Sequence, residues 1–202
     1  MISNINRLIT VREFDLQKNH TAKRILLFVK NTLPKFEFIY KQNNSVLYIE
    51  DDISKELSRY FNDEARADNL FFQFNEKKGV DFTIHVTPYI MGAKSIFMIE
   101  AKRLSKSHYD YVYGRTGGIE RIKREQEGFN EDVEISAMIG YIQDEDKDYW
   151  KVKINNWIQD LIERKTDIDW FDEDKISTDF TSLHSRITKE KISLYHFWIH
   201  LN

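Results

Sequence analysis

The 202-residue chain contains no cysteine, and this absence removes several classes of site. Without cysteine the chain can form no disulfide, no thiolate metal centre and no cysteine nucleophile. Zinc ribbons, iron–sulfur clusters and papain-like chemistry are therefore excluded. Any metal ion must bind to oxygen or imidazole ligands.

The sequence also lacks a long hydrophobic run. The first 20 residues hold no apolar stretch of signal-peptide length, and Lys, Asp or Pro interrupts every later stretch well before the roughly 18 residues that a membrane span requires. We therefore expect a cytoplasmic protein that does not contact a membrane. The net charge of -3 gives the whole chain no attraction to nucleic acid, so a nucleic-acid interface would need a local basic patch.

Proline and glycine are scarce, with two and seven residues respectively, and no internal repeat or low-complexity tract is present. With 41% hydrophobic residues, the chain is long enough to bury one ordinary core. The sequence therefore predicts a single domain that covers residues 1–202.

The amino-terminal part of the chain reads as helix, extended segments and a second helix. Apolar residues recur at helical spacing over residues 21–33 and predict a helix that ends before Pro34. Residues 36–40 and 46–49 are predicted to be extended. Asp51 or Asp52 is then a suitable N-cap for a helix that ends near Asn62 or Asp68.

The rest of the chain is richer in strand patterns. Alternating or continuous apolar residues predict strands over 71–74, 80–86, 95–102, 135–142, 180–187 and 192–201, with helices over 119–127 and 149–164. Strands in this order, interleaved with helices, predict an α/β fold with a mixed sheet and helices packed on its faces.

The chemically informative segment contains Asp81 and the triplet Glu100-Ala101-Lys102. Glu100 and Lys102 end an apolar strand, and the two-residue period places both side chains on one face. If strands 80–87 and 95–102 form an antiparallel hairpin, Asp81 lies opposite Glu100 or Lys102. Two carboxylates and one ammonium would then converge at one end of the hairpin.

Converging carboxylates repel each other and raise each other's pKa unless a cation lies between them, which favours Mg²⁺ at this position. The chemistry that fits is phosphodiester hydrolysis. Asp81 and Glu100 would hold the metal, and Lys102 would orient the attacking water or stabilise charge on the phosphorane. The alternative interpretation is that Asp81 and Glu100 form ordinary ion pairs with Lys102.

This pattern, in which Glu100-Ala101-Lys102 follows Asp81 by 19 positions and ends an apolar strand, resembles the PD-(D/E)XK nuclease superfamily. The resemblance implies a restriction-endonuclease-like mixed β-sheet flanked by helices, and DNA cleavage that depends on Mg²⁺ or Mn²⁺. The usual Pro before the Asp is Val80 in this chain. Residues 46–142 would form the catalytic core, and residues 1–45 an amino-terminal helical or extended extension.

In this superfamily an acidic residue on the helix before the hairpin often completes the metal site. The matching stretch in this chain is IEDDISKELSRYF. The resemblance assigns that role to Glu50, with Asp52 and Glu56 as alternatives.

The likeness extends over roughly residues 46–200, where the chain resembles uncharacterised prokaryotic nuclease-like proteins that accompany antiphage systems. The resemblance therefore implies a role in antiviral defence. A small nuclease without a recognition domain would be toxic if unregulated. We therefore expect a partner protein, either an ATPase or a sensor subunit, or a homodimer.

Charge is unevenly distributed along the chain. Residues 100–126 carry an excess of +3, whereas residues 143–175 carry −5. The basic residues that follow the predicted site are candidates for DNA phosphate contacts, namely Arg103, Lys106, Arg115, Arg121 and Arg124. The alternative is a solvated amphipathic helix. The alternative function is a catalytically weak or inactive nuclease-fold subunit that binds DNA or a partner protein.

Overall fold

The structure is a computed structural model, and it describes residues 11–43, 49–77, 80–87, 94–105, 109–114, 117–125, 133–164, 170, 175–188 and 190–202. Six strands form one open mixed sheet in the order β1-β2-β3-β4-β6-β5. The strands are β1 (Phe72–Lys77), β2 (Val80–Val86), β3 (Phe97–Leu104), β4 (Ile135–Ile142), β5 (Thr181–Ser185) and β6 (Lys191–His200). The α/β class and the mixed sheet are as the sequence predicts.

The sheet combines two kinds of pairing. β1, β2 and β3 form an antiparallel meander, β3, β4 and β6 run parallel, and β5 returns antiparallel to β6. Parallel neighbours need a crossover through a helix, and the chain supplies one between β3 and β4 and another between β4 and β5. The central strand β3 is therefore buried on both sides.

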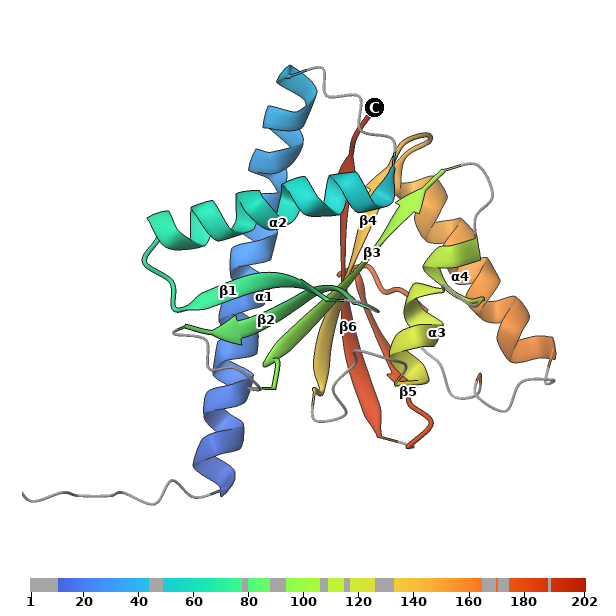
Figure 1. Cartoon of the computed structure of the whole chain (residues 1–202). Helices are drawn as coiled ribbons and strands as arrows, with labels where there is room; N and C mark the ends of the chain where they lie inside the picture. The colour runs from blue at the N-terminus through green and yellow to red at the C-terminus, as the bar shows by residue number, and fades with distance from the viewer. Residues whose placement is uncertain are drawn as a thin grey trace, which may run out of the picture.

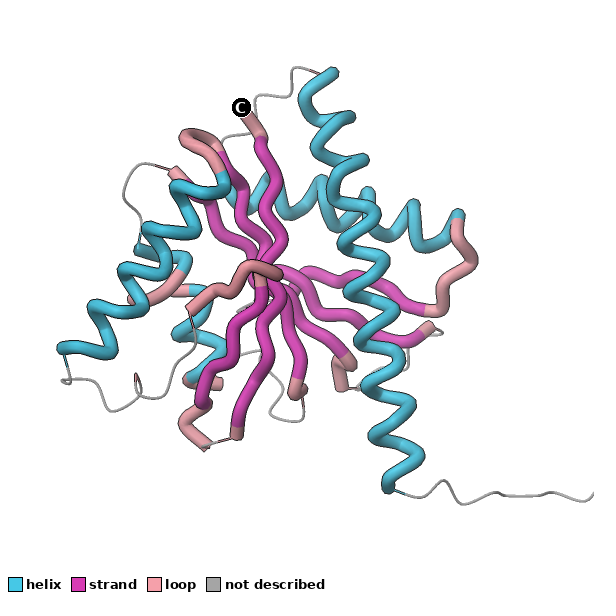
Figure 2. Tube along the Cα trace, turned by 180° about the vertical axis from the view of Figure 1, so that it is seen from behind, coloured by secondary structure: helices cyan, strands magenta, loops and turns pink. Residues whose placement is uncertain are grey.

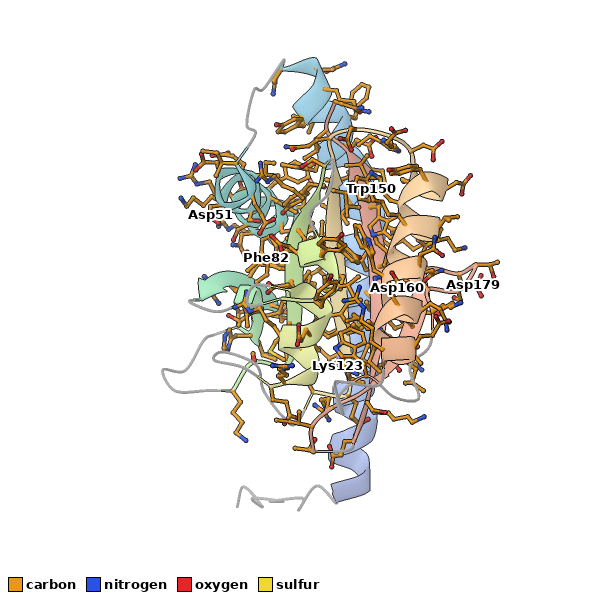
Figure 3. All side chains as sticks on the ribbon, turned by 90° about the vertical axis from the view of Figure 1, so that its right-hand side faces the viewer. Asp51, Phe82, Lys123, Trp150, Asp160 and Asp179 are labelled. Carbon is orange, nitrogen blue, oxygen red and sulfur yellow. The ribbon has the colours of Figure 1, made fainter. Side chains whose placement is uncertain are left out.

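Helices cover both faces of the sheet (Figures 1 and 2). α1 (Val11–Gln42) and α2 (Glu50–Ala67) pack on one face, and the other carries the short 3₁₀ helix η1 (Tyr109–Tyr111), α3 (Gly118–Lys123) and α4 (Lys147–Arg164). Two hydrophobic clusters result, one on each side of the sheet. Phe82 belongs to the first and Trp150 to the second, and both are labelled in Figure 3.

The first helix differs from the prediction. α1 does not end before Pro34 but continues through residues 36–40, which are not extended. Pro34 is exposed, whereas Leu33, Phe36 and Tyr40 around it are buried. These apolar residues recur every three to four positions, as on one face of a helix, and not every two positions as in a strand. Burial of this helix face offsets the roughly 3 kcal/mol that an interior proline costs a helix.

Smaller differences concern the ends of elements. α2 begins at Glu50 with Ile49 as its N-cap residue, not Asp51 or Asp52, and no side chain caps it. The acidic first turn is nevertheless favourable at the positive end of the helix dipole. The extended segment expected at 46–49 lies outside the described residues except for Ile49, whose backbone is extended but which belongs to none of the described strands.

The expected helix over 119–127 ends earlier, because α3 stops at Lys123. The strands at 80–86 and 135–142 have the predicted bounds. The two strands predicted in the tail are also present, as β5 and β6. Among the described helices, none is both long enough and apolar enough to cross a membrane.

Candidate active site

Strand β3 buries two charged side chains at the centre of the sheet. Ile99 and Ala101 belong to the hydrophobic cluster under α1 and α2. Glu100 and Lys102 alternate with them and therefore point to the opposite face, where α3 lies. Glu100 is 0% exposed and Lys102 only 5%. Such burial is costly for charged groups unless each one is paired.

Asp81 reaches this pair from the neighbouring strand. β2 pairs antiparallel with β3, and Phe82 lies opposite Ile99, so the next position brings Asp81 beside Glu100. The backbone N–H of Ala101 donates a hydrogen bond to Asp81 Oδ2 at 2.8 Å. This bond fixes the carboxylate against β3, at the hairpin position that the sequence pattern predicts.

Glu50 joins the cluster from the first turn of α2. Its Oε1 accepts a hydrogen bond from Lys102 Nζ at 3.0 Å, and its Oε2 accepts one from the backbone N–H of Arg103 at 2.8 Å. Both carboxylate oxygens are thus tied to the end of β3. The start of α2 is therefore anchored to the strand that carries the triplet.

The two alternatives to Glu50 do not take part in this cluster. Asp52 lies 3.6 Å from Lys55, one turn along the helix. Glu56 pairs with Arg59, also one turn along. Both are surface pairs on α2, so the structure brings Glu50 to Lys102 and leaves Asp52 and Glu56 on the helix surface.

The Lys102 ammonium is the centre of the arrangement. Its Nζ lies 2.9 Å from Glu100 Oε1, 3.0 Å from Glu50 Oε1 and 3.9 Å from Asp81 Oδ2. The second cation is Arg121 of α3, whose Nη1 lies 2.8 Å from Glu100 Oε1. Three carboxylates therefore meet two cations, which leaves one negative charge in excess.

The pKa values reflect this excess of acid. Burial and the nearby Glu100 carboxylate raise the pKa of Asp81 to about 7, against the opposing effects of Lys102 and the Ala101 N–H. Burial alone would lower the pKa of Lys102, but Glu100, Asp81 and Glu50 outweigh it and raise that pKa. Lys102 is therefore held as an ammonium, and the charged form of Asp81 is disfavoured.

One carboxylate oxygen in the cluster has no hydrogen-bond partner among the described residues. Glu100 Oε2 is buried and accepts no hydrogen bond within the described part of the chain. No group of three or more His, Asp or Glu residues forms a metal cage among the described residues. Mg²⁺, however, commonly binds to one or two carboxylates, with water and phosphate as its other ligands. Asp81 and Glu100 fit that smaller donor set.

The basic residues expected near the site fall into three groups. Arg121 contacts Glu100 directly. Arg124 pairs with Glu120 at 2.6 Å on α3, and the backbone of Arg103 binds Glu50. Two further candidates, Lys106 and Arg115, lie outside the described residues. A DNA-binding role for all five stays a prediction.

A buried contact between two hydroxyl groups supports the site, and no pattern in the sequence predicts it. Ser54 Oγ and Tyr141 Oη lie 3.0 Å apart, although 87 residues separate them in sequence. Ser54 is one helical turn after Glu50, and Tyr141 on β4 lies opposite Arg103 of β3. Burial raises the pKa of Tyr141 well above its usual value. The neutral pair therefore fixes the first turn of α2 over the sheet.

A second buried polar group lies between η1, β5 and β6. Hydrogen bonds of 2.7 to 2.8 Å link five side chains one after another, namely His184, Ser182, His196, Tyr111 and Trp198. Burial, and then His184, lower the pKa of His196 well below its usual value, so the imidazole is neutral. Each member has a partner, which is typical of a satisfied polar core.

Comparisons of the chain with protein-family models, with curated proteins and with solved structures find no match.

Proposed function

We propose that the protein is a metal-dependent nuclease that hydrolyses DNA phosphodiester bonds. The observation that carries the proposal is the buried Lys102 ammonium at the meeting point of Glu50, Asp81 and Glu100. A structural ion pair needs one carboxylate for each ammonium. One buried and two half-buried carboxylates around one ammonium destabilise the fold unless they serve a further purpose, and cation-assisted chemistry on a phosphate is such a purpose.

Each residue of the cluster has a definable role in this chemistry. Asp81 and Glu100 would hold Mg²⁺ or Mn²⁺, which when bound lowers the pKa of a water molecule and screens the phosphate charge. Lys102 orients the attacking water or stabilises the negative charge that develops on the phosphorane. Glu50 holds the Lys102 ammonium in place, and Arg121 holds the Glu100 carboxylate.

The proposal includes a restriction-endonuclease-like fold. A mixed sheet with helices on both faces supports this part, as does the position of Asp81 and the Glu100-Ala101-Lys102 triplet on adjacent antiparallel strands. A cytoplasmic location, a role in antiphage defence and regulation by an ATPase, a sensor or a second copy of the chain belong to the same proposal. The location rests on the lack of a long apolar run in the sequence, the defence role on the sequence resemblance, and the regulation on the toxicity expected of a small nuclease.

One observation favours a second candidate, a catalytically weak or inactive subunit that binds DNA or a partner protein. Lys102 and Arg121 both contact the same oxygen of Glu100. The cluster's own cations thus neutralise most of its charge, as they would in a structural ion-pair network. Under this alternative the carboxylates have no metal to bind.

A cleavage assay separates the two candidates. Purified protein is incubated with plasmid, linear DNA and RNA in Mg²⁺, Mn²⁺ or EDTA. We expect metal-dependent cutting of DNA that Asp81→Asn and Lys102→Ala abolish. The matched control, Glu56→Gln, removes an acid from the surface of α2 and should cut as the wild type does.

The negative outcome is equally specific. If the wild type cuts none of these substrates and its melting temperature does not respond to Mg²⁺ or Mn²⁺, the nuclease proposal is wrong. The binding-subunit alternative would then be the better one, and gel-shift measurements with the same DNA would test it.

A further inference from the structure

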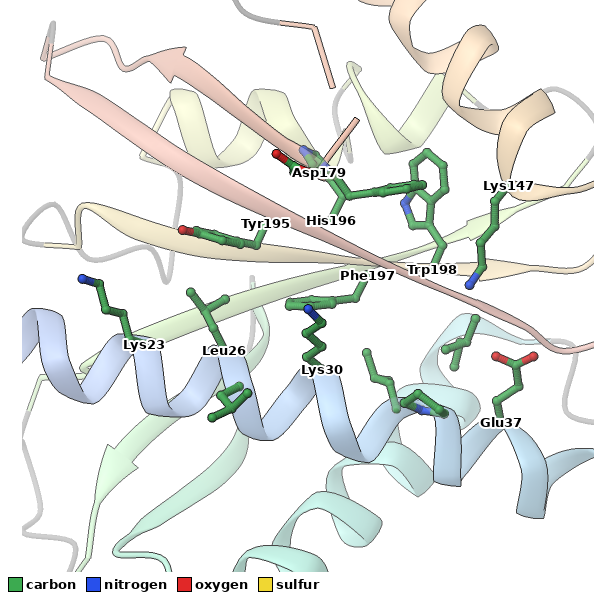
Figure 4. A pocket seen from close by; sticks show the side chains of 15 residues that line it. Lys23, Leu26, Lys30, Glu37, Lys147, Asp179, Tyr195, His196, Phe197 and Trp198 are labelled. Atoms are coloured by element: carbon green, nitrogen blue, oxygen red, sulfur yellow. The ribbon is translucent and has the colours of Figure 1, made fainter. Parts of the chain in front are cut away.

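A groove of about 870 Å³ lies between α1 and the end of β6, away from the carboxylate cluster (Figure 4). Its walls include Lys23 and Lys30 of α1 and Tyr195 and Phe197 of β6. Tyr195 and Phe197 pack on the α1 face of the sheet, whereas the Lys102 side chain points to the α3 face. The groove is therefore separate from the site described above.

The sheet topology explains why the groove exists. β5 pairs with β6 only as far as Tyr195, so no described strand covers the edge of β6 beyond it. The His196 N–H points to the edge of β6 that faces β5, where it donates a hydrogen bond to the Phe180 carbonyl at 2.8 Å. Because backbone groups of alternate residues point to the same edge, the N–H and C=O of Trp198 face the open side. The groove thus contains backbone donor and acceptor groups.

The floor of the groove is aromatic. Tyr195 and Phe197 are two residues apart and share one face of β6, and both side chains are half-buried. Leu26 and Leu33 of α1 add aliphatic surface. A planar ring can stack on such a floor while its edge meets the backbone of β6.

The walls carry both signs of charge. Lys23 and Lys30 lie two helical turns apart on α1, about 10 Å along its axis, and Lys147 faces them from the start of α4. Among the described residues, no carboxylate pairs with Lys23 or Lys30. Glu37 and Asp179 also line the groove. The ligand must therefore offer an anionic group and also neutral hydrogen-bond donors that carboxylates can accept.

We propose that this groove binds a nucleotide. The base stacks on Tyr195 and Phe197 and hydrogen-bonds to the free edge of β6, the phosphate binds the lysines, and the ribose hydroxyls donate to a carboxylate. The volume falls within the range of about 300 to 1,000 Å³ that is typical of small-molecule sites. A nucleotide thus matches the floor, the open backbone edge and both kinds of charge.

The other occupant that an open edge suggests is an acidic peptide added as a seventh strand. The His196 N–H is already bonded to the Phe180 carbonyl, so the free edge runs only from Phe197 to His200, shorter than the usual strand of about five to six residues. The carboxylates of such a peptide also offer no hydrogen-bond donor to Glu37 and Asp179, whereas ribose hydroxyls do. A nucleotide fits better on both counts.

Titration calorimetry in EDTA tests the proposal without any contribution from metal-dependent chemistry. The probes are AMP, adenosine, ribose 5-phosphate and a five-residue acidic peptide. We expect AMP to bind and to raise the melting temperature. Adenosine lacks the phosphate and ribose 5-phosphate lacks the base, so each should bind at least about tenfold more weakly than AMP.

Variants assign the binding to the groove. Lys23→Gln/Lys30→Gln should weaken AMP about tenfold and leave adenosine unchanged, whereas Phe197→Leu should weaken both. The matched control, Lys35→Gln/Lys55→Gln, removes two exposed lysines outside the groove and should bind AMP as the wild type does.

Three outcomes would overturn the proposal: no AMP binding at millimolar concentration, AMP binding that the groove variants do not weaken, or binding of the acidic peptide in preference to AMP. Asp81→Asn should bind AMP normally. The cutting of DNA by this variant therefore tests the nuclease proposal alone, and its binding of AMP tests the groove proposal alone. The two proposals can fail independently.

Discussion

Replacing Asp81 by Asn should stabilise the protein at neutral and alkaline pH while abolishing the proposed cleavage. The carboxyl group of Asp81 has its pKa raised to about 7 by burial and by Glu100, so ionising it above that pH destabilises the fold. Asn has the same shape and no charge. Its side-chain oxygen can still accept the hydrogen bond of the Ala101 N–H.

The magnitude follows from the pKa difference between the two states. A change from 3.8 to about 7 corresponds to an upper limit of about 4 kcal/mol at 1.36 kcal/mol per unit. Because the folded pKa is the higher one, the native state binds more protons between these values, and its stability falls as pH rises through this window. The advantage of Asp81→Asn should therefore grow from pH 4 to pH 7 and then remain constant.

Urea denaturation of both proteins between pH 4.5 and 8.5 measures this difference, and contributions from groups that do not interact with Asp81 cancel. Asp52→Asn, which removes an exposed acid on α2, is the control and should show no such trend. Mg²⁺ should stabilise the wild type and not Asp81→Asn. A difference that does not change with pH, or a variant less stable than the wild type at pH 8, would refute the reasoning.

Three further predictions concern the surroundings of the site. Lys102→Met should destabilise the fold by about 3–5 kcal/mol at neutral pH, because it leaves Glu100 buried without its ammonium, and urea titrations should show this loss shrinking as acid protonates the carboxylates. Tyr141→Phe removes the contact with Ser54 and should lower stability by about 1 kcal/mol; cleavage should fall as well, and unchanged kinetics would show that α2 is positioned by other contacts. In Gly140→Ala the new Cβ would lie 2.5 Å from Trp198 and 2.7 Å from Leu104, so thermal melts should show a loss of about 1–3 kcal/mol, whereas a neutral result would mean that β4 and β6 separate easily.

The fold of the central sheet could be predicted from the sequence because its pattern is local. Residues 80–86 alternate, and residues 135–142 form a short apolar run, so the bounds of β2 and β4 are as expected. The meeting of Asp81 with Glu100 and Lys102 has the same origin. It depends on the register of one hairpin, and that register is set by the pairing of two strands that follow each other in sequence.

Residues 36–40 could not be predicted in this way. FEFIY favours a strand by composition, and Pro34 favours a break. The helix persists because Phe36 and Tyr40 pack against α2 and the sheet, a contact between segments far apart in sequence. Tertiary burial outweighed the local preference at this point.

The meeting of Asp81, Glu100 and Lys102 at one end of a hairpin follows from the sequence, since period and register are properties of adjacent strands. That Glu50, and not Asp52 or Glu56, reaches Lys102 follows only from the packing of the whole chain, because all three acids lie within two turns of one helix. That choice depends on how α2 is rotated about its axis. The contact of Ser54 with Tyr141 and the burial of Ile53, Leu57 and Phe61 set this rotation, and the partners of these residues come from distant parts of the chain.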